Sequence, residues 1–304
     1  MDELPEAVRG GTPRSPRLVT PHLLADWPLP EPSGSKYSRG QALVVGGARA
    51  TPGGVLLAGR AALRTGAGRL SVAVAESVAQ HVAVALPECG AHGLAEDAHG
   101  SVTGSGAGRV LGRELGRADA VLVGPGLDDA NGTARLLDEI VPELPAETPV
   151  VLDAYGLTSL PDADPATSRA LRGRLVLTPN AVELAHLLGR ERVDDGEVVE
   201  ASLEAARRYD AVVGCGTTVV SGGRTWQVTT GDTGLGTSGS GDVVAGAAVG
   251  LLSRGATPLQ ALVWAKYVHA AAGDDLVMTF GRVGYLAGEL VDQLPRVLRS
   301  LHGN

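Results

Sequence analysis

The sequence is poor in the residues that mark several protein classes. Its two cysteines, Cys89 and Cys215, are too few for a disulfide framework, and its seven histidines form no H-x-x-x-H pair typical of a zinc site. No apolar run approaches the roughly 18 residues that span a membrane, and residues 1–23 lack the continuous apolar stretch of a secretory signal. These absences favour a soluble, cytoplasmic protein without a membrane partner.

Lysine and aromatic residues are also scarce, and negative charge exceeds positive charge. The formal net charge of −8 and the pI of about 5.4 argue against nucleic acid as a partner. The only lysines are Lys36 and Lys266, and neither stands in the Gly-Lys-Ser/Thr context of a Walker P-loop. Aromatic residues make up 3% of the chain, so we expect a core of alanine, valine and leucine. With 304 residues and 44% hydrophobic content, the chain is long enough for one large domain.

Apolar runs of strand length alternate with helical patterns along most of the chain. Runs rich in β-branched residues and separated by helices predict a parallel sheet that helices cover on both faces. We predict one α/β domain over residues 36–304 with a mainly parallel sheet of about eight strands and a helical C-terminal third. Residues 1–35, rich in proline, glycine, arginine and serine, are predicted to form a flexible arm. The expected strands are Ala42–Val45, Leu70–Ala75, Ala120–Val123, Val150–Asp153, Leu175–Thr178, Ala211–Val213, Thr218–Ser221 and Thr225–Thr229.

Glycines and polar residues follow five of these expected strands. Ligands of parallel α/β sheets bind beyond the carboxyl ends of the strands, so these segments predict a cleft along one sheet edge. Any one of them alone has the alternative interpretation of an ordinary strand-to-helix turn. The segments are Gly46–Gly54, Gly124–Gly126, Asp153–Tyr155, Pro179–Glu183 and Gly214–Thr218.

The loop Gly236-Thr-Ser-Gly-Ser-Gly-Asp242 is the most informative segment of the chain. Its glycines allow the backbone N–H groups to converge on an anion, and the apolar run Val243–Leu252 predicts a helix whose positive end points into the loop. Asp242 at this helix start is a candidate general base, which would remove a proton from a hydroxyl while Gly239, Ser240 and Gly241 hold a phosphoryl group. The alternative is that Asp242 only caps the helix.

The same segment also fits the dinucleotide-binding pattern G-x-G-x-x-G at Gly234–Gly239. That pattern requires a second strand after the helix, with an acidic residue about 20 residues beyond the glycines. Here the helix is followed by Arg254–Pro258 and by another helical run, Leu259–Leu276. The context therefore excludes a Rossmann site.

Taken together, these motifs resemble those of the ADP/ATP-dependent NAD(P)H-hydrate dehydratases of the ribokinase-like superfamily. The resemblance covers roughly residues 36–275 and implies a three-layer α/β/α fold. Its most specific blocks are Gly46–Gly54 and Arg64–Leu70, because sugar kinases of the superfamily do not usually carry them. The remaining blocks are Leu86–Glu88, Val123–Leu127, Leu152–Leu157, Leu177–Glu183 and Gly239–Gly246. Members of the family are often fused to an epimerase domain, and 35 residues before the domain predict a stand-alone dehydratase.

The resemblance implies a metabolite-repair reaction, the dehydration of hydrated NADH or NADPH. ADP (or ATP) would be the co-substrate and would give AMP (or ADP) and phosphate. Asp242 would deprotonate the ring hydroxyl, the terminal phosphoryl group would be transferred to it, and phosphate would then leave. The enzyme would be a hydro-lyase that acts on small molecules in the cytoplasm, as a homo-oligomer for which a tetramer is usual.

Residue roles follow from the same resemblance. Gly54, Gly126 and Asn180 would approach the hydrated nicotinamide together with Asp242. Glu183 would hold Mg²⁺ through water, although Asn180 and Glu183 also have the alternative role of a helix cap. The nucleotide phosphates and ribose would contact Gly214, Cys215, Gly216, Thr217 and Thr218, and Gly241 would donate to the transferred group.

Three positions depart from the family pattern, and all lie at the predicted cleft. The usual His-Pro-Gly-Glu is Asn180–Glu183, the usual Asp-Ala-Asp is Asp153–Tyr155, and the usual Lys-Gly-Ala is Gly214–Gly216. Loss of the lysine predicts weaker nucleotide binding. Two alternatives stay open: a superfamily kinase for a vitamin-like alcohol of the hydroxymethylpyrimidine or thiazole type, which Asn180-x-x-Glu183 favours, and a nucleotide-binding remnant without turnover.

Overall fold

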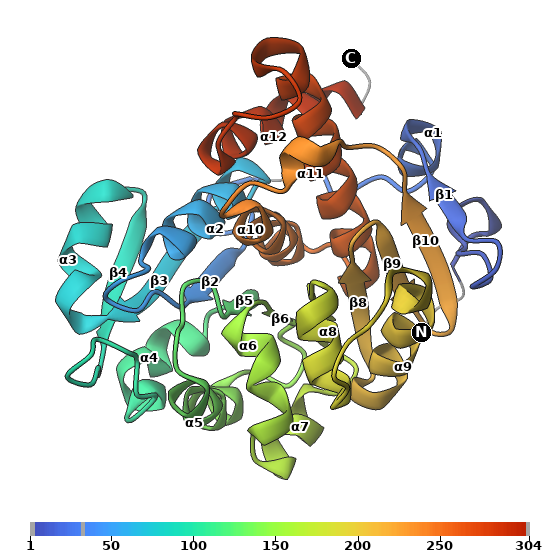
Figure 1. Cartoon of the computed structure of the whole chain (residues 1–304). Coiled ribbons are helices and arrows are strands. Elements are labelled where there is room, and N and C mark those ends of the chain that lie inside the picture. Colours follow the sequence, from blue (N-terminus) through green and yellow to red (C-terminus); the bar gives the residue numbers. More distant parts are fainter. Residues whose placement is uncertain (1–3, 32–33, 302–304) are drawn as a thin grey trace.

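The computed structural model describes residues 4–31 and 34–301 as a sheet between two layers of helices (Figure 1). The strands are β1 (Arg17–Val19), β2 (Gln41–Val45), β3 (Arg69–Ala75), β4 (Cys89–Leu94), β5 (Ala120–Val123), β6 (Val150–Leu152), β7 (Leu175–Leu177), β8 (Ala211–Cys215), β9 (Thr218–Ser221) and β10 (Arg224–Val228). The α-helices are α1 (Pro21–Ala25), α2 (Gly53–Arg64), α3 (Glu76–Ala85), α4 (Ala107–Leu115), α5 (Ala130–Ile140), α6 (Tyr155–Thr158), α7 (Pro165–Leu171), α8 (Ala181–Leu188), α9 (Val198–Tyr209), α10 (Ser240–Ser253), α11 (Pro258–Phe280) and α12 (Ala287–Leu301).

The ten strands form one mainly parallel sheet in the order β1-β10-β9-β8-β7-β6-β5-β2-β3-β4. Only β9 runs antiparallel, to both β8 and β10. The predicted α/β/α fold is thus confirmed, and each of the eight expected strands is present. The sheet is larger than expected because β1 and β4 extend its two edges. The strand order reverses between the parallel neighbours β2 and β5, because β3 and β4 follow on one side and β6 and β7 on the other. Such a switch point is where parallel α/β sheets bind ligands.

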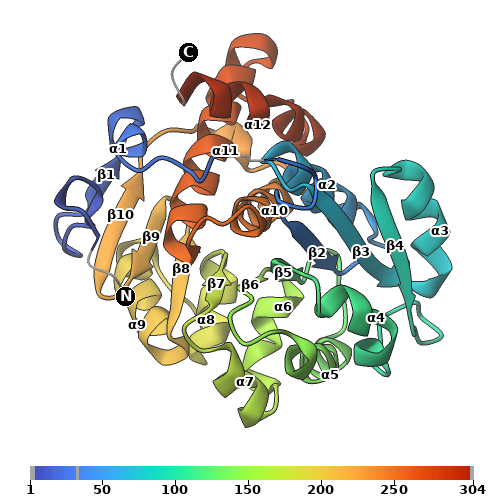
Figure 2. The same ribbon diagram turned by 180° about the vertical axis from the view of Figure 1, so that it is seen from behind.

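Alternate side chains of the central strands enter two separate hydrophobic cores. In β2, Ala42 and Val44 belong to one core, whereas Leu43 and Val45 belong to the other. Both faces of the strand are fully buried, as expected for a parallel sheet between helices. Helices α2, α10, α11 and α12 cover one face, and helices α4 to α9 cover the other (Figures 1 and 2).

The N-terminal segment packs against the sheet over its described residues. β1 lies parallel to β10, and the indole N–H of Trp226 donates to the Val8 carbonyl at 3.0 Å. Val8, Leu23 and Leu24 are buried in the first of the two cores. We expected a flexible arm here. Residues 4–31 instead contribute a strand and a helix to the packed structure, while the division of the chain into an arm and one domain stays a prediction.

The C-terminal helices are close to the prediction. α10 begins three residues before the expected Val243, and α11 extends the expected Leu259–Leu276 at both ends. α12 completes the helical end of the chain. None of the helices in the described parts of the chain is both long and apolar enough to cross a membrane.

Candidate active site

The loops that follow β2 and β5 are bonded to each other at the switch point. The N–H of Gly47 donates to the Pro125 carbonyl at 2.8 Å, and the N–H of Ala48 donates to the Gly126 carbonyl at 2.7 Å. The Thr51 hydroxyl also donates to Gly126 O, at 2.8 Å. Two glycine-rich segments that are far apart in the sequence, Gly46–Gly54 and Gly124–Gly126, are therefore held together as one rigid surface at the carboxyl end of the sheet. We call this surface the glycine floor.

Gly54 and Gly126 allow this floor to approach α10 closely. A Cβ on Gly54 would lie 3.0 Å from the Gly126 nitrogen and 3.1 Å from Asp242 Oδ1. Gly126 has φ of +70°, and a Cβ there would lie 2.1 Å from the Thr51 carbonyl oxygen. The structure thus brings two of the predicted substrate residues next to the predicted base.

Asp242 lies in the first turn of α10 but does not cap it. The N-cap is Gly239, with φ of +86°, and the cap has no side-chain hydrogen bond. By contrast, the Asp129 and Asp164 side chains accept N–H bonds at the starts of α5 and α7. The Asp242 carboxylate accepts no hydrogen bond from the described residues, and burial raises its pKa from 3.8 to about 6. The helix-cap interpretation is therefore wrong for this residue.

In the predicted anion-binding loop, some backbone N–H groups already have an acceptor and others do not. The N–H of Ser240 donates to the Thr237 carbonyl at 3.2 Å, so it is already satisfied. The Ser240 hydroxyl is buried and lies 2.8 Å from His269 Nε2, which joins α10 to α11. Burial lowers the pKa of His269 to about 3, so this imidazole is neutral. Among the described residues, Gly239 and Gly241 are the members of the predicted trio whose N–H groups have no backbone acceptor.

Two further carboxyl groups belong to this region, and the charges of Asp242 and Glu183 both act on the first of them, Asp153. Asp153 follows β6, is buried, and accepts the Thr178 hydroxyl at 2.8 Å. Burial raises its pKa to about 7, and the charges of Asp242 and Glu183 add to this effect. Burial also raises the pKa of Glu183. The sequence placed Asp153–Tyr155 at the predicted cleft but gave Asp153 no role of its own, because aspartate after a strand is common in turns.

Asn180 and Glu183 form a capping box at the start of α8. The Glu183 N–H donates to Asn180 Oδ1, and the Asn180 N–H donates to Glu183 Oε2, both at 2.9 Å. This local bond engages one carboxylate oxygen of Glu183. The described residues contain no group of three or more side chains that could hold a metal ion by themselves.

A cavity of about 290 Å³ lies beside the first turn of α10. Its lining combines one apolar wall with hydroxyl groups and backbone, and one lysine, one histidine and one aspartate complete it. The lining residues are Gly216, Thr217, Val228, Thr230, Gly231, Asp232, Leu235, Val244, Lys266, His269 and Ala270. A volume near 300 Å³ is at the small end of the range for ligand sites.

The predicted nucleotide residues divide between the cavity and the sheet. Gly216 and Thr217, in the turn between β8 and β9, line the cavity. Gly214, Cys215 and Thr218 are strand residues and are buried. These three residues support the turn from within the sheet. The structure therefore places two of the five predicted nucleotide residues at the cavity wall.

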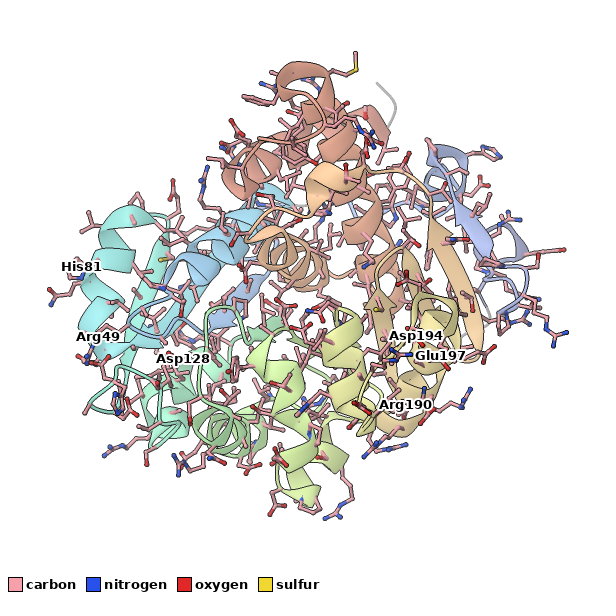
Figure 3. The ribbon with its side chains drawn as sticks, in the orientation of Figure 1. Arg49, His81, Asp128, Arg190, Asp194 and Glu197 are labelled. Carbon is pink, nitrogen blue, oxygen red and sulfur yellow. The ribbon has the colours of Figure 1, made fainter. Side chains whose placement is uncertain are left out.

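Lys266 is a site residue that sequence reasoning did not find. It projects from α11, and its ammonium donates to the Gly214 carbonyl at 3.3 Å. Burial lowers its pKa from 10.5 to about 8. Arg49, although it lies in the glycine-rich loop after β2, points to the periphery and pairs with Glu96 and Ser77 (Figure 3).

Comparisons with known proteins agree on one family. A family model described as NAD(P)H-hydrate dehydratase matches residues 42–296. The chain is 40% identical to an ADP-dependent (S)-NAD(P)H-hydrate dehydratase of Xanthomonas campestris, over 94% of this chain and 97% of that protein. An ADP/ATP-dependent NAD(P)H-hydrate dehydratase of Bacillus subtilis, co-crystallised with ATP and Mg²⁺, has 26% identity and a TM-score of 0.74, with 94% and 98% of the two chains covered. A ribokinase-like protein of Enterococcus faecalis shares the fold at 20% identity and a TM-score of 0.76, over 94% and 96%.

Proposed function

The chain belongs to the NAD(P)H-hydrate dehydratase family, and we propose that it converts hydrated NADH or NADPH back to NAD(P)H. ADP (or ATP) is the co-substrate and gives AMP (or ADP) and phosphate. The position of Asp242 is the observation that carries this proposal. Its carboxylate is half-buried, accepts no hydrogen bond from the described residues, and faces the glycine floor formed by Gly54 and Gly126.

The proposed reaction has a transfer step and an elimination step. Asp242 accepts the proton of the ring hydroxyl, whose oxygen attacks the terminal phosphorus, and the shortened nucleotide leaves. The N–H groups of Gly239 and Gly241, together with the positive end of α10, stabilise the negative charge on the phosphoryl oxygens. The C–O bond then breaks. Phosphate and a proton from the neighbouring ring carbon are lost, which restores the ring double bond.

We place the nucleotide in the cavity beside α10. Val228, Leu235, Val244 and Ala270 give it an apolar wall suited to a base, and the turn at Gly216–Thr217 offers backbone and hydroxyl groups for ribose and phosphate. Gly214, Cys215 and Thr218 hold this turn in register through the β8–β9 pairing. Val244 of the cavity lining lies two residues after Asp242 in α10, and His269 of the lining contacts Ser240, so a nucleotide there reaches the Asp242 loop.

The residues present also fit Mg²⁺ held mainly by phosphate and water. Mg²⁺ usually keeps several waters and takes one or two carboxylates, so it needs no complete protein cage. Glu183 has one carboxylate oxygen outside its capping box, and Asp153 and Asp242 add negative charge around it. Glu183 would hold the ion through water, and the bound ion would neutralise charge on the phosphates.

Two further expectations belong to this proposal. We expect the protein to act in the cytoplasm, where its reduced nicotinamide substrates would be met. We also expect a homo-oligomer, with a tetramer as the form to test by light scattering.

The pattern that favoured a vitamin-alcohol kinase has a structural explanation in this chain. Asn180 and Glu183 are three residues apart because they form the capping box of α8. This structural role explains the spacing of the two residues without an alcohol substrate. We therefore retain the dehydratase hypothesis.

One assay separates the proposed function from its alternatives. The purified protein is mixed with hydrated NADH and ADP or ATP, and the absorbance of reduced nicotinamide is followed. Recovery that requires the nucleotide is expected. Nucleotide consumption with a hydroxymethylpyrimidine or thiazole alcohol, and not with hydrated NADH, would identify a kinase. Nucleotide binding with neither reaction would identify a remnant.

A further inference from the structure

Lys266 is a partly buried cation that lines the cavity next to α10. Its side chain reaches from α11 to β8, where the ammonium donates to the Gly214 carbonyl. Among the residues that the structure describes, it is the only lysine or arginine in the cavity lining. The positive charge of this part of the protein is therefore concentrated at one atom, Nζ.

The ammonium is incompletely paired. It has three N–H donors, and one carbonyl is the acceptor found within the described structure. No carboxylate of the described residues lies within ion-pair distance of it. The pKa of Lys266, lowered to about 8 by burial, still leaves it mainly protonated at neutral pH. The charge of Asp153 acts on this ammonium only from a distance, so a partly buried charge is left without a counter-ion in direct contact, and an anion in the cavity would lower the cost of its burial.

We propose that the Lys266 ammonium binds a phosphate group of the adenine nucleotide. This inference rests on the proposed function, because it assigns the cavity to the nucleotide. The base and the ribose carry no negative charge, and the rest of the cavity lining offers them apolar surface, hydroxyl groups, backbone and the neutral His269. The one carboxylate of the lining, Asp232, is paired with Arg282. A cation at this wall therefore selects for the phosphorylated part of the ligand.

The absence of a side chain at position 214 makes room for this lysine. A Cβ on Gly214 would lie 3.1 Å from Lys266 Cδ and 2.9 Å from Leu262 Cδ2. A larger residue on β8 would therefore displace the lysine stem. The glycine at position 214 on β8 therefore leaves space for Lys266 of α11. The positive charge at this wall of the cavity comes from the helix and not from the strand.

The test compares the ligand preference of two lysine variants by calorimetry. K266M keeps much of the length of the side chain and removes its charge, whereas K36M changes the exposed second lysine and is the control. For K266M we expect ADP binding to weaken about ten- to a hundredfold, as for loss of a charge-assisted contact. Adenosine, which lacks phosphate, should bind with unchanged affinity. K36M should bind both ligands as the wild type does.

Proton uptake gives a second readout that needs no variant. A phosphate beside Lys266 raises the pKa of its ammonium, so ADP binding at about pH 8.5 should take up a fraction of a proton. The titratable groups around Lys266 are Cys215, Asp153 and His269. At that pH the Cys215 thiol, with its raised pKa, stays protonated, Asp153 is ionised and His269 is neutral. Titrations in buffers of different ionisation enthalpy measure the uptake.

The outcomes separate this inference from the proposed function. If the wild type binds no adenine nucleotide, the proposed function itself is wrong. If the wild type binds ADP without proton uptake, or if K266M binds ADP as tightly as the wild type, the phosphate assignment is wrong. An equal loss of ADP and adenosine in K266M would also overturn it, because it would show a general change of cavity shape.

Discussion

The carboxylate of Asp242 and the backbone of Gly54 are in direct apposition, with only 3.1 Å between Oδ1 and the place where a Cβ on Gly54 would be. The contact joins the first turn of α10 to the first turn of α2. Any side chain at position 54 would therefore act on the proposed base. This geometry makes the two residues a sensitive test of the site.

Gly54→Ala should impair turnover with little effect on stability. The added methyl group would push the Asp242 carboxylate and Gly126 apart, and small displacements of a catalytic group cost roughly ten- to a hundredfold in kcat/KM. Gly53→Ala is the matched control, because a Cβ on Gly53 would meet no atom within 4 Å. Steady-state kinetics and thermal melting of both variants check this. Equal kinetic effects of the two changes would contradict the geometry.

Asp242→Asn should abolish turnover and leave the fold intact. The change removes basicity, which is worth about 10²–10⁴-fold in rate, but it disturbs no cap because Asp242 bonds to no N–H group of its helix. We expect a melting temperature at or slightly above that of the wild type, with ADP binding retained. Asp164→Asn, at a true capping position of α7, is the control and should keep full activity. Normal turnover of the Asp242 variant would refute the base assignment.

The sequence predicted the central strands well because burial on both faces leaves a clear pattern. Val121, Leu122 and Val123, for example, are fully buried and β-branched or leucine. The edge strand β4 escaped prediction because Cys89–Leu94 contains two glycines and a histidine and is only partly buried. β1 has three residues and lies in a segment rich in proline and glycine, so its pairing with β10 has no local signal.

The same distinction applies to the site. The glycine loops and Asp242 were found because consecutive residues of the sequence show them: closely spaced glycines mark backbone that needs unusual conformations, and Asp242 directly follows such glycines. Lys266 was not found, because it is one of several polar residues on α11 and no local motif marks it. Its role at the site is apparent only from its contact with Gly214, which lies 52 positions earlier in the chain. Long-range contacts of this kind need the three-dimensional structure.

Ser240→Ala should destabilise the protein through His269. The Ser240 hydroxyl is the partner of His269 Nε2 at 2.8 Å in a buried position, so the change leaves a buried polar nitrogen without it. The cost is about 1–3 kcal/mol of unfolding free energy, and the melting temperature should fall by several degrees. Ser105→Ala, at an exposed serine, is the control for calorimetric melting. An unchanged melting temperature for Ser240→Ala would show that the bond contributes nothing.

The rate should depend on pH through the proposed base. Asp242 acts in its deprotonated form, so kcat/KM should fall as the pH drops through its pKa of about 6. Asp153, with a pKa of about 7, interacts with Asp242, so the two apparent values belong to the pair. Because the pKa of Asp153 is the higher of the two, Asp153 is still mostly protonated where Asp242 ionises, so Asp153→Asn should leave the rise in kcat/KM near pH 6. A profile that is flat between about pH 5 and pH 8 would exclude a carboxylate base with this pKa.

Asp153→Asn should also change how stability depends on pH. The pKa of Asp153 is 3.8 in the unfolded reference and about 7 in the fold, so the native state holds its proton more tightly. The stabilisation from this raised pKa is fully present below the unfolded pKa and is lost as the pH rises through about 7. Asparagine can still accept the Thr178 hydroxyl and carries no charge. We therefore expect the variant to melt several degrees above the wild type at about pH 8 and close to it at about pH 4. Calorimetric melting across this range checks the expectation, and a stabilisation that is equal at both ends would show that ionisation of Asp153 is not its cause.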